Sequence, residues 1–550
     1  MILMKKSKYL VAAVLLICLL LGVCGCQNEP KRTLLPTLEP TAAPDLETAH
    51  KLTVTAEPAE GGTAVLSRDL VRYGETAELT VSCSAGYKVA SVKVNGKDVF
   101  FCNGVGKISG MTEDGQVTVQ FAEKRESSPE KVVPGSITAT FYNQAATEIG
   151  ISWHTDQEGI PVVKVRKAEG ADRDNPDFSE GMTVAGYTYF TAANYANYAA
   201  LQNLEPDTEY LYVVGDSEHN VYSQVCSFHT KAENPDKMIF LHFSDSQDDV
   251  NFGTIWAGGL KDAFSRYKEA AFVLNTGDMV QEGGKEELWN KMLDITGDYL
   301  HNNILVYAAG NHDYWDAYLY GATQCAFSHF CIDVPNRQNV REGMYYSFDY
   351  GDAHVTVLNT GDSQETDDWG LTVDQIRWVK QDLLSTDKTW KIVAMHNPLY
   401  SPGKYGSGSD YNLMALTLRK QLNSIFSECG VDLVLTGHDH VYSRTYPVSA
   451  EGEPLRKTKT KTENDIEYMI NPQGPVHLAS GVAGNQARGI FEEFPEGERE
   501  MFQQMQETTF EHCTYSAITI EGNRLTVEYY DVNGAGGESQ RVYSWGILKK

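Results

Sequence analysis

Five short apolar segments in the second half of the chain each end in side chains that can bind a metal ion or transfer a proton. The segments MIFLHF, AFVLN, ILVYAA, WKIVAM and VDLVL lead into SDSQ at 244–247, TGD at 276–278, GNHD at 310–313, HNP at 396–398 and TGHDH at 436–440. In open α/β sheets the ligand crevice lies at the carboxyl ends of the strands. Five such endings therefore predict one shared site.

Six side chains at these ends are candidate metal ligands: Asp245, Asp278, Asn311, His396, His438 and His440. This mixture of oxygen and nitrogen donors suits divalent transition metals better than calcium. The absence of cysteine from the set argues against a structural zinc site. Six ligands exceed what one tetrahedral ion needs, whereas they suit two ions about 3.5–4 Å apart that share a carboxylate.

Each of these residues also has an ordinary structural interpretation. An aspartate such as Asp245 can cap a helix, and an asparagine such as Asn311 can adopt a left-handed turn. A single histidine such as His396 can be a hydrogen-bonded core residue. The segment LNTGD occurs twice, at 274–278 and 358–362, which makes Asp362 an alternative to Asp278. The order of the motifs along the chain favours Asp278.

The order and spacing of these motifs resemble the calcineurin-like metallophosphoesterase superfamily. The stretches YYSFDYGDAHVTVLNT, MHNPLYSPG, GHDHVYSRTYP and YSWGILKK narrow the resemblance to bacterial and plant purple acid phosphatases, over residues 134–550. This resemblance implies one ion bound by Asp245, Asp278 and His440. It implies a second ion bound by Asn311, His396 and His438, with Asp278 as the bridge.

The resemblance also implies phosphoester hydrolysis in which a metal-bound hydroxide attacks phosphorus. His312 would protonate the leaving oxygen or stabilise charge at the phosphate, and Asp313 would orient the His312 imidazole. A phosphomonoesterase of the acid phosphatase type is the first hypothesis for a phosphate ester substrate. A phosphodiesterase or nucleotidase of the same superfamily is the second. A surface binding or adhesion protein that has lost its activity is the third.

Three positions depart from the family motifs. Gln281 stands three residues after Asp278, where purple acid phosphatases have the tyrosine that binds ferric iron, so no ferric-tyrosinate site is expected. Gln247 stands where the wider superfamily has a histidine, which makes its amide oxygen a weak, tentative metal ligand. GNHD at 310–313 replaces the usual GNHE. These departures leave the identity of the two metals open among Fe, Zn and Mn.

The residues between the apolar segments predict the elements that position them. Helical stretches alternate with the segments: TIWAGGLKDAFSRYKEA, EELWNKMLDITGDYL, VDQIRWVKQDLLS and LMALTLRKQLNSIFSECG. In the third stretch, Ile376, Val379 and Leu383 share one helical face. The alternation predicts an α/β domain. The resemblance implies that residues 237–550 form a four-layer α/β/β/α metallophosphoesterase sandwich.

Two all-β domains are predicted to precede this sandwich. Residues 51–123 alternate apolar and polar side chains between glycine-rich turns. They resemble a small internalin-type B repeat, which suggests a spacer with possible cell-wall or surface contacts. A linker covers 124–133. Residues 134–232 resemble a fibronectin type III-like sandwich, with Trp153 in a core strand and Tyr210 as a corner tyrosine that bonds back to the backbone.

The first 26 residues are predicted to be a bacterial lipoprotein signal peptide. Lys5, Lys6 and Lys8 precede an apolar core, and Gly25-Cys26 resembles a lipobox, so Cys26 would carry the lipid. Residues 27–50, rich in Pro, Thr and Glu, would form a flexible tether. We therefore expect an extracytoplasmic protein that a lipid anchors to the cell membrane. The formal net charge of −28 disfavours nucleic acid as a partner.

Overall fold

The computed structural model describes residues 48–550 apart from 73–74, 100, 103–104, 110, 125, 192–193, 233–234, 249, 315–323, 334–343, 362–369, 405–412, 493–496 and 535–536. The predicted signal peptide with Cys26, and residues 27–47 of the predicted tether, lie outside the described residues. Among the helices in the described part of the chain, none has the length and apolar character needed to cross a membrane.

The first described domain consists of two small sheets that pack face to face. One sheet has the order β3 (Leu70–Arg72), β1 (Ala49–Glu57), β9 (Gly115–Glu123), β5 (Tyr87–Val94) and β6 (Lys97–Asp98). The other has the order β2 (Gly62–Leu66), β4 (Ala77–Cys83), β8 (Val105–Ile108) and β7 (Phe101–Cys102). Alternate residues such as Leu79, Val81 and Val117 form the core between them, as the alternating sequence pattern predicts.

The second domain is also a two-sheet sandwich. One sheet has the order β10 (Gly135–Phe141), β11 (Ile149–Thr155), β15 (Tyr195–Leu201) and β14 (Tyr187–Phe190). The other has the order β13 (Met182–Ala185), β12 (Pro161–Lys167), β16 (Glu209–Asp216) and β17 (Val221–Tyr222), and β18 (Cys226–His229) also pairs with β16. Trp153 is fully buried in the core. The hydroxyl of Tyr210 accepts a hydrogen bond from the backbone N–H of Glu205 at 2.9 Å. The predicted corner tyrosine is therefore confirmed.

Two large sheets form the centre of the third domain. The first has the order β21 (Leu305–Tyr307), β20 (Phe272–Asn275), β19 (Lys237–Phe243), β31 (His512–Glu521), β32 (Arg524–Asn533), β33 (Ser539–Leu548), β28 (Ile466–Ile470) and β27 (Thr460–Glu463). The second has the order β22 (Tyr346–Tyr350), β23 (Ala353–Val357), β24 (Trp390–Ala394), β25 (Leu433–Thr436), β29 (Val476–Ser480), β26 (Tyr442–Thr445) and β30 (Phe502–Gln506).

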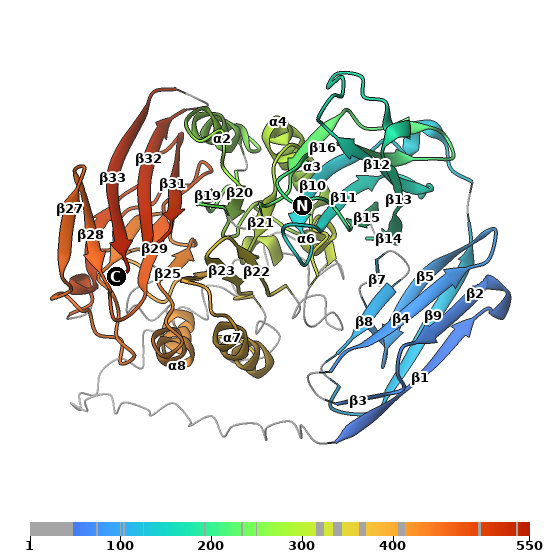
Figure 1. The fold of residues 1–550 in the computed structure, drawn as a ribbon, viewed down its shortest axis with the longest axis horizontal. Helices are drawn as coiled ribbons and strands as arrows, with labels where there is room; N and C mark the ends of the chain where they lie inside the picture. The colour runs from blue at the N-terminus through green and yellow to red at the C-terminus, as the bar shows by residue number, and fades with distance from the viewer. Residues whose placement is uncertain are drawn as a thin grey trace, which may run out of the picture. The chain divides into compact units, whose positions relative to one another are not determined.

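Helices cover the outer faces of both sheets (Figure 1). On the first sheet lies α2 (Thr254–Arg266), against β31 and β32, while α3 (Glu286–Ile295) and α4 (Gly297–Leu300) contact β10 of the second domain. The short helix α6 covers Gln324–Ser328. On the second sheet lie α7 (Val373–Ser385) and α8 (Leu413–Glu428). Val379 and Leu383 of α7 pack on Val393 of β24 in one buried cluster. The predicted α/β/β/α arrangement is therefore confirmed.

The register of the parallel strands brings their polar endings to the same edge. Phe243 of β19 pairs with Asn275 of β20, which pairs with Tyr307 of β21. In the second sheet, Ala394 of β24 pairs with Leu435 of β25. Because each of these residues is the last or nearly the last of its strand, all five predicted motifs begin at one level of the two sheets.

The second and third domains share one continuous core. Ala139 of β10 forms a parallel bridge with Ile304, next to β21. The ring of Phe141 packs edge-on against Phe272 of β20, with ring centroids 5.6 Å apart. The hydroxyl of Tyr212 donates to the carbonyl of His301 at 2.8 Å. These contacts join the β-sandwich to the edge of the first large sheet.

A buried polar cluster lies at this seam. Glu286 Oε1 lies 2.7 Å from His154 Nδ1 and 2.9 Å from Asn194 Nδ2, and His329 Nε2 lies 3.3 Å away. The His154 and His329 rings stack at 4.1 Å with an interplanar angle of 12°. His154, Glu286 and His329 each offer one ligand atom, and these atoms lie within 4.8 Å of one another. The cluster links the two domains through buried polar side chains, chiefly through the contacts of Glu286 with His154 and Asn194.

We predict that Glu286→Ala lowers the free energy of unfolding by about 3 kcal/mol, because the nitrogen atoms of His154 and Asn194 would stay buried without this acceptor. Glu287→Ala at the exposed neighbouring position should change it by less than about 0.5 kcal/mol. Urea denaturation of both variants measures the difference. Equal losses of unfolding free energy in Glu286→Ala and Glu287→Ala would show that the cluster does not stabilise the fold.

The same cluster predicts that acid weakens the seam. Burial lowers the pKa of His329 to about 4, below the value of about 6.5 for an unfolded histidine. A proton therefore binds His329 more strongly in the unfolded chain than in the folded one. The stabilisation by neutral His329 is complete above about pH 6.5 and is lost as the pH falls toward about 4. Urea midpoints across this range measure the loss, and His329→Phe should reduce it.

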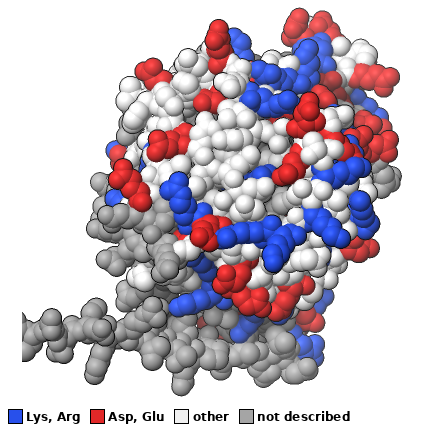
Figure 2. Space-filling view, turned by 90° about the vertical axis from the view of Figure 1, so that its left-hand side faces the viewer, with Lys and Arg blue, Asp and Glu red and all other residues white. Residues whose placement is uncertain are grey.

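The surface carries both signs of charge despite the net negative charge. On the face in Figure 2, acidic and basic side chains are interspersed. Ion pairs such as Lys461–Glu463 and Arg456–Glu500 link opposite charges on the described surface. A net charge of −28 repels anionic substrates at long range. Attraction of such a substrate must therefore come from cationic groups in the site itself.

Candidate metal centre

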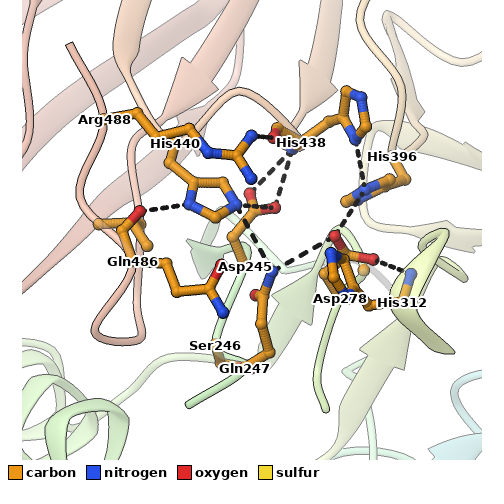
Figure 3. A network of polar contacts seen from close by, with 12 residues as sticks. Asp245, Ser246, Gln247, Asp278, His312, His396, His438, His440, Gln486 and Arg488 are labelled. Carbon is orange, nitrogen blue, oxygen red and sulfur yellow. Dashed lines mark hydrogen bonds and ion pairs between the residues drawn. The ribbon is translucent and has the colours of Figure 1, made fainter. Parts of the chain in front are cut away.

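Four of the six candidate ligands have left-handed backbone conformations. Their φ values are +54° at Asp245, +53° at Asp278, +74° at His438 and +54° at His440. Non-glycine residues adopt positive φ uncommonly, and Asp and His tolerate it better than most residue types. Each turn directly follows a strand, so the side chains enter one common space between the two sheets (Figure 3).

Two glycines permit the close approach of these turns. A Cβ atom on Gly310 would collide with the backbone nitrogen and Oδ1 of Asp278. A Cβ atom on Gly437 would collide with the hydroxyl of Ser244 and approach the Asp245 carboxylate. The glycines of GNHD and GHDH are therefore needed because ligand-bearing turns from different strands touch at these points.

Asp245, Asp278 and His440 form the first half of the site. Each offers one ligand atom, and these atoms lie within 4.8 Å of one another. His440 Nε2 lies 3.3 Å from Asp245 Oδ1. All three side chains are buried. The structure therefore brings together the three residues predicted to bind the first ion.

Asp278, His396 and His438 form the second half, under the same 4.8 Å limit. His396 Nε2 lies 3.2 Å from Asp278 Oδ2, 3.1 Å from Asn311 Oδ1 and 3.2 Å from His438 Nδ1. The structure thus also brings together the residues predicted for the second ion. Asp278 belongs to both halves, which is the position that a bridging carboxylate occupies.

Backbone carbonyls orient two of the histidines. His396 Nδ1 lies 2.7 Å from the carbonyl oxygen of Thr276, and His440 Nδ1 hydrogen-bonds the carbonyl of Gln486. A ring that donates from Nδ1 presents the lone pair of Nε2 to the centre, as metal-binding histidines do. The donor set therefore fits two cations.

The charges around the site are consistent with cation binding. Burial disfavours the imidazolium of His396, yet Asp278 and Asp245 raise the pKa of His396 to about 9. Burial and the neighbouring His396 lower the pKa of His438 to about 3. The two carboxylates thus stabilise a positive charge beside them, which can be a proton on His396 or a metal ion.

Gln247 is arranged as a neutral oxygen ligand. In the amide orientation that satisfies its hydrogen bonds, the nitrogen donates to the carbonyl oxygens of Asp278 at 2.8 Å and Asp245 at 3.2 Å. The amide oxygen then lies on the side of Asp278 Oδ2 and His440 Nε2. The sequence prediction of a tentative ligand at Gln247 is compatible with this geometry.

His312 lies at the edge of the centre and is held by the second motif. Its backbone N–H donates to Asp278 Oδ1 at 2.7 Å, and its Nδ1 lies 2.8 Å from the carbonyl oxygen of Gln281. The ring is almost buried, with 8 % of the residue exposed. The Gln281 carbonyl therefore orients the imidazole.

The prediction that Asp313 orients His312 is wrong. The Asp313 carboxylate accepts from the backbone N–H groups of Asp278, Met279 and Gly310, each at 2.9 Å, and from the Tyr307 hydroxyl at 2.7 Å. Buried N–H groups of the tight turn at 277–280 need an acceptor, and the short Asp313 side chain reaches them. Asp313 thus supports the loop that carries Asp278.

We predict that Asp313→Asn weakens metal binding about 10- to 100-fold, because an amide nitrogen would face N–H donors and displace the Asp278 turn. Burial, and then Asp278, raise the pKa of Asp313 to about 6, so acid should act in the same direction as the substitution. Competition with a chelating dye measures metal affinity. If Asp313 acted through His312, turnover would fall while metal affinity stayed unchanged.

A further loop, residues 481–490, completes the wall of the site. The backbone N–H groups of Ala483 and Gly484 donate to the carbonyls of Ser244 and Asp245 at 2.8 and 2.9 Å. The Gln486 side chain donates to the side chain of Gln281. Sequence reasoning missed this loop, although the apolar run VHLAS just before it forms a sixth strand, β29.

Arg488 is the second residue of this loop that sequence reasoning missed. Its Nη1 donates to the backbone carbonyl of His438 at 2.8 Å (Figure 3).

The alternative ligand Asp362 lies outside the described residues.

Comparisons with known proteins agree with this site. Residues 238–442 match the calcineurin-like phosphoesterase family, and residues 134–230 match the N-terminal domain of purple acid phosphatases. An uncharacterized protein of Mycobacterium tuberculosis is 24 % identical over 64 % of this chain and 69 % of its own length. Phosphoenolpyruvate phosphatase of Allium cepa is 24 % identical over 74 % and 79 %.

Solved structures show the same fold. A purple acid phosphatase from yellow lupin seeds, PPD1, superposes with a TM-score of 0.61 at 17 % identity, over 86 % of this chain and 93 % of its own. PhoD superposes with a TM-score of 0.55 at 13 % identity, over 78 % and 92 %. The chain thus contains a calcineurin-like phosphoesterase domain preceded by a domain of the purple acid phosphatase N-terminal type, and it is a hydrolase of phosphoric esters.

Proposed function

We propose that this purple acid phosphatase-like enzyme is an extracytoplasmic phosphomonoesterase that works with two metal ions. The observation that carries the proposal is the pair of three-ligand groups that share Asp278. The named relatives support the choice of a monoester, since they include an acid phosphatase of Aspergillus ficuum and the phosphoenolpyruvate phosphatase of Allium cepa.

The residues of the chain would divide the work as follows. Two cations at the site would supply charge neutralisation of the phosphate oxygens and a water-derived nucleophile near neutral pH. Asp278 would bind both cations, and Asn311 would add a neutral ligand beside His396. His312, with its Nδ1 held by the Gln281 carbonyl, would direct Nε2 toward the phosphate. From there it would stabilise developing charge or protonate the leaving oxygen.

The metals proposed are Fe, Zn or Mn, without a ferric-tyrosinate site. The side chain of Gln281 bonds with Gln486 and has no ionisable phenol. We predict that the iron-loaded protein shows no visible tyrosinate absorption band, whereas Gln281→Tyr loaded in the same way gains one. Absorption spectroscopy measures both. A visible band in the unaltered protein would mean that another tyrosine reaches the iron.

The testing experiment is hydrolysis of p-nitrophenyl phosphate by the full chain purified in detergent. Activity is measured before chelation, after chelation and after adding back Mn, Zn or Fe. Metal-dependent turnover is the expected result. Turnover of bis-p-nitrophenyl phosphate alone would favour the phosphodiesterase hypothesis. No turnover of either ester with any metal, while the metals stay bound, would favour a binding protein that has lost its activity.

The proposed location is the outer side of a bacterial membrane, with a lipid on Cys26. The support is the order of Lys5, Lys6 and Lys8, the apolar core, and Gly25-Cys26. The β domain at 51–123 is a proposed spacer or cell-wall contact. Labelling with a fatty acid should mark the protein, and Cys26→Ala should lose the label. A labelled Cys26→Ala variant would overturn the assignment.

A further inference from the structure

Hydrogen bonds from both the backbone and the guanidinium of Arg488 hold this residue beside the turn that carries His438 and His440. Its backbone N–H donates to the hydroxyl of Thr508 at 3.1 Å, and that hydroxyl donates to the carbonyl of His440 at 2.6 Å. Its guanidinium donates to the carbonyl of His438 at 2.8 Å. The side chain therefore spans the turn that carries both histidines, and its charge lies at the centre's edge (Figure 3).

The position of Arg488 does not follow from packing alone. The side chain is only partly buried, whereas Asp245, Gln247 and His440 below it are buried. A planar cation with several N–H groups at the edge of a dianion-binding site suits the recognition of phosphate oxygens.

We propose that Arg488 contacts the phosphate of the substrate and sets the preference for monoesters over diesters. This inference rests on the proposed function. A phosphomonoester carries about −1.5 to −2 charges near neutral pH, with three terminal oxygens. A phosphodiester carries one charge and two terminal oxygens. If two bound cations neutralise two of the phosphate oxygens, the third oxygen and the extra charge of the monoester would need a further cationic group. Arg488 is placed to supply it.

The test compares Arg488→Met, which removes the charge, with Arg488→Lys, which keeps the charge without the planar fork. In Arg488→Met, kcat/KM for p-nitrophenyl phosphate should fall about 100-fold. The value for bis-p-nitrophenyl phosphate should fall by less than about 5-fold. Arg488→Lys should lie between Arg488→Met and the unaltered protein. Metal content, measured by mass spectrometry, should stay unchanged in both variants.

A matched control is Arg524→Met. Arg524 pairs with Glu521 on β31, and Glu521 pairs with Lys237 at the start of β19. This register places Arg524 at the end of the sheet opposite to the metal centre. Its removal should leave the ratio of monoester to diester turnover unchanged.

Binding of orthophosphate to the metal-loaded protein tests Arg488 without turnover. Its dissociation constant should rise about 30-fold in Arg488→Met, because a charge-assisted contact is lost. Unchanged orthophosphate affinity, equal losses on both esters, or loss of metal in Arg488→Met would each overturn the inference. If the unaltered protein hydrolyses neither ester, the proposed function fails, and the orthophosphate measurements still decide the role of Arg488.

Discussion

Replacing Asp278 with alanine is expected to lower turnover of a phosphomonoester at least about 1,000-fold and to remove both metal ions. Asp278 belongs to both three-ligand groups, and its Oδ2 lies 3.2 Å from His396 Nε2. Its Oδ1 also accepts the backbone N–H of His312 at 2.7 Å. Asp278→Ala therefore removes the carboxylate shared by the two ligand groups and the acceptor that holds the backbone of His312.

Metal content of Asp278→Ala and of the unaltered chain, measured after gel filtration, tests this prediction beside activity. Asp262→Ala is the control, because Asp262 is also a carboxylate with several partners, here the Tyr515 and Ser539 hydroxyls. It lies on α2, away from the candidate ligands, so its metal content should be normal. Two bound metals in a folded Asp278→Ala variant would exclude the bridging role.

His312→Ala is expected to lower kcat about 100- to 1,000-fold while both metals remain bound. His312 belongs to neither three-ligand group, and its Nδ1 lies 2.8 Å from the Gln281 carbonyl oxygen. The loss should therefore come from the chemical step and not from metal binding. An acid limb in the pH dependence of kcat should change in the variant if His312 transfers a proton.

The pH profile and metal content of His312→Ala separate this role from a structural one. His219→Ala is a suitable control, because His219 pairs with Asp216 in the second β domain, outside the metal centre. It should leave kcat and metal content unchanged. Loss of metal from His312→Ala would place His312 among the groups that hold the centre together. An unchanged kcat would exclude it from the reaction.

Much of the centre could be predicted because its motifs are local. A buried parallel strand reads as a short apolar run, and its polar ending lies within a few residues of it. Asp245, Asp278 and His396 were found in this way, and the register of the strands brings them together. The alternation of such runs with helical stretches predicted an α/β domain, and the family resemblance supplied the four-layer arrangement.

The contacts of the loop at 481–490 could not be predicted from the sequence. VHLAS is an apolar run like the others, but GVAGNQARG offers no carboxylate or histidine after it. Gln486 and Arg488 act on His440 and His438 through backbone carbonyls. A carbonyl is present at every position, so no residue type marks such a contact in a sequence.

The strand endings and the six candidate ligands could be predicted from the chain alone, because each is encoded in residues close together in sequence. The support of the Asp278 turn by Asp313 and the orientation of His312 by Gln281 are visible only once the chain is folded. Only the tertiary structure joins Glu286 to His154 across 132 residues of chain. The direction of a hydrogen bond depends on the packed positions of both partners, and packing is decided by contacts between distant segments.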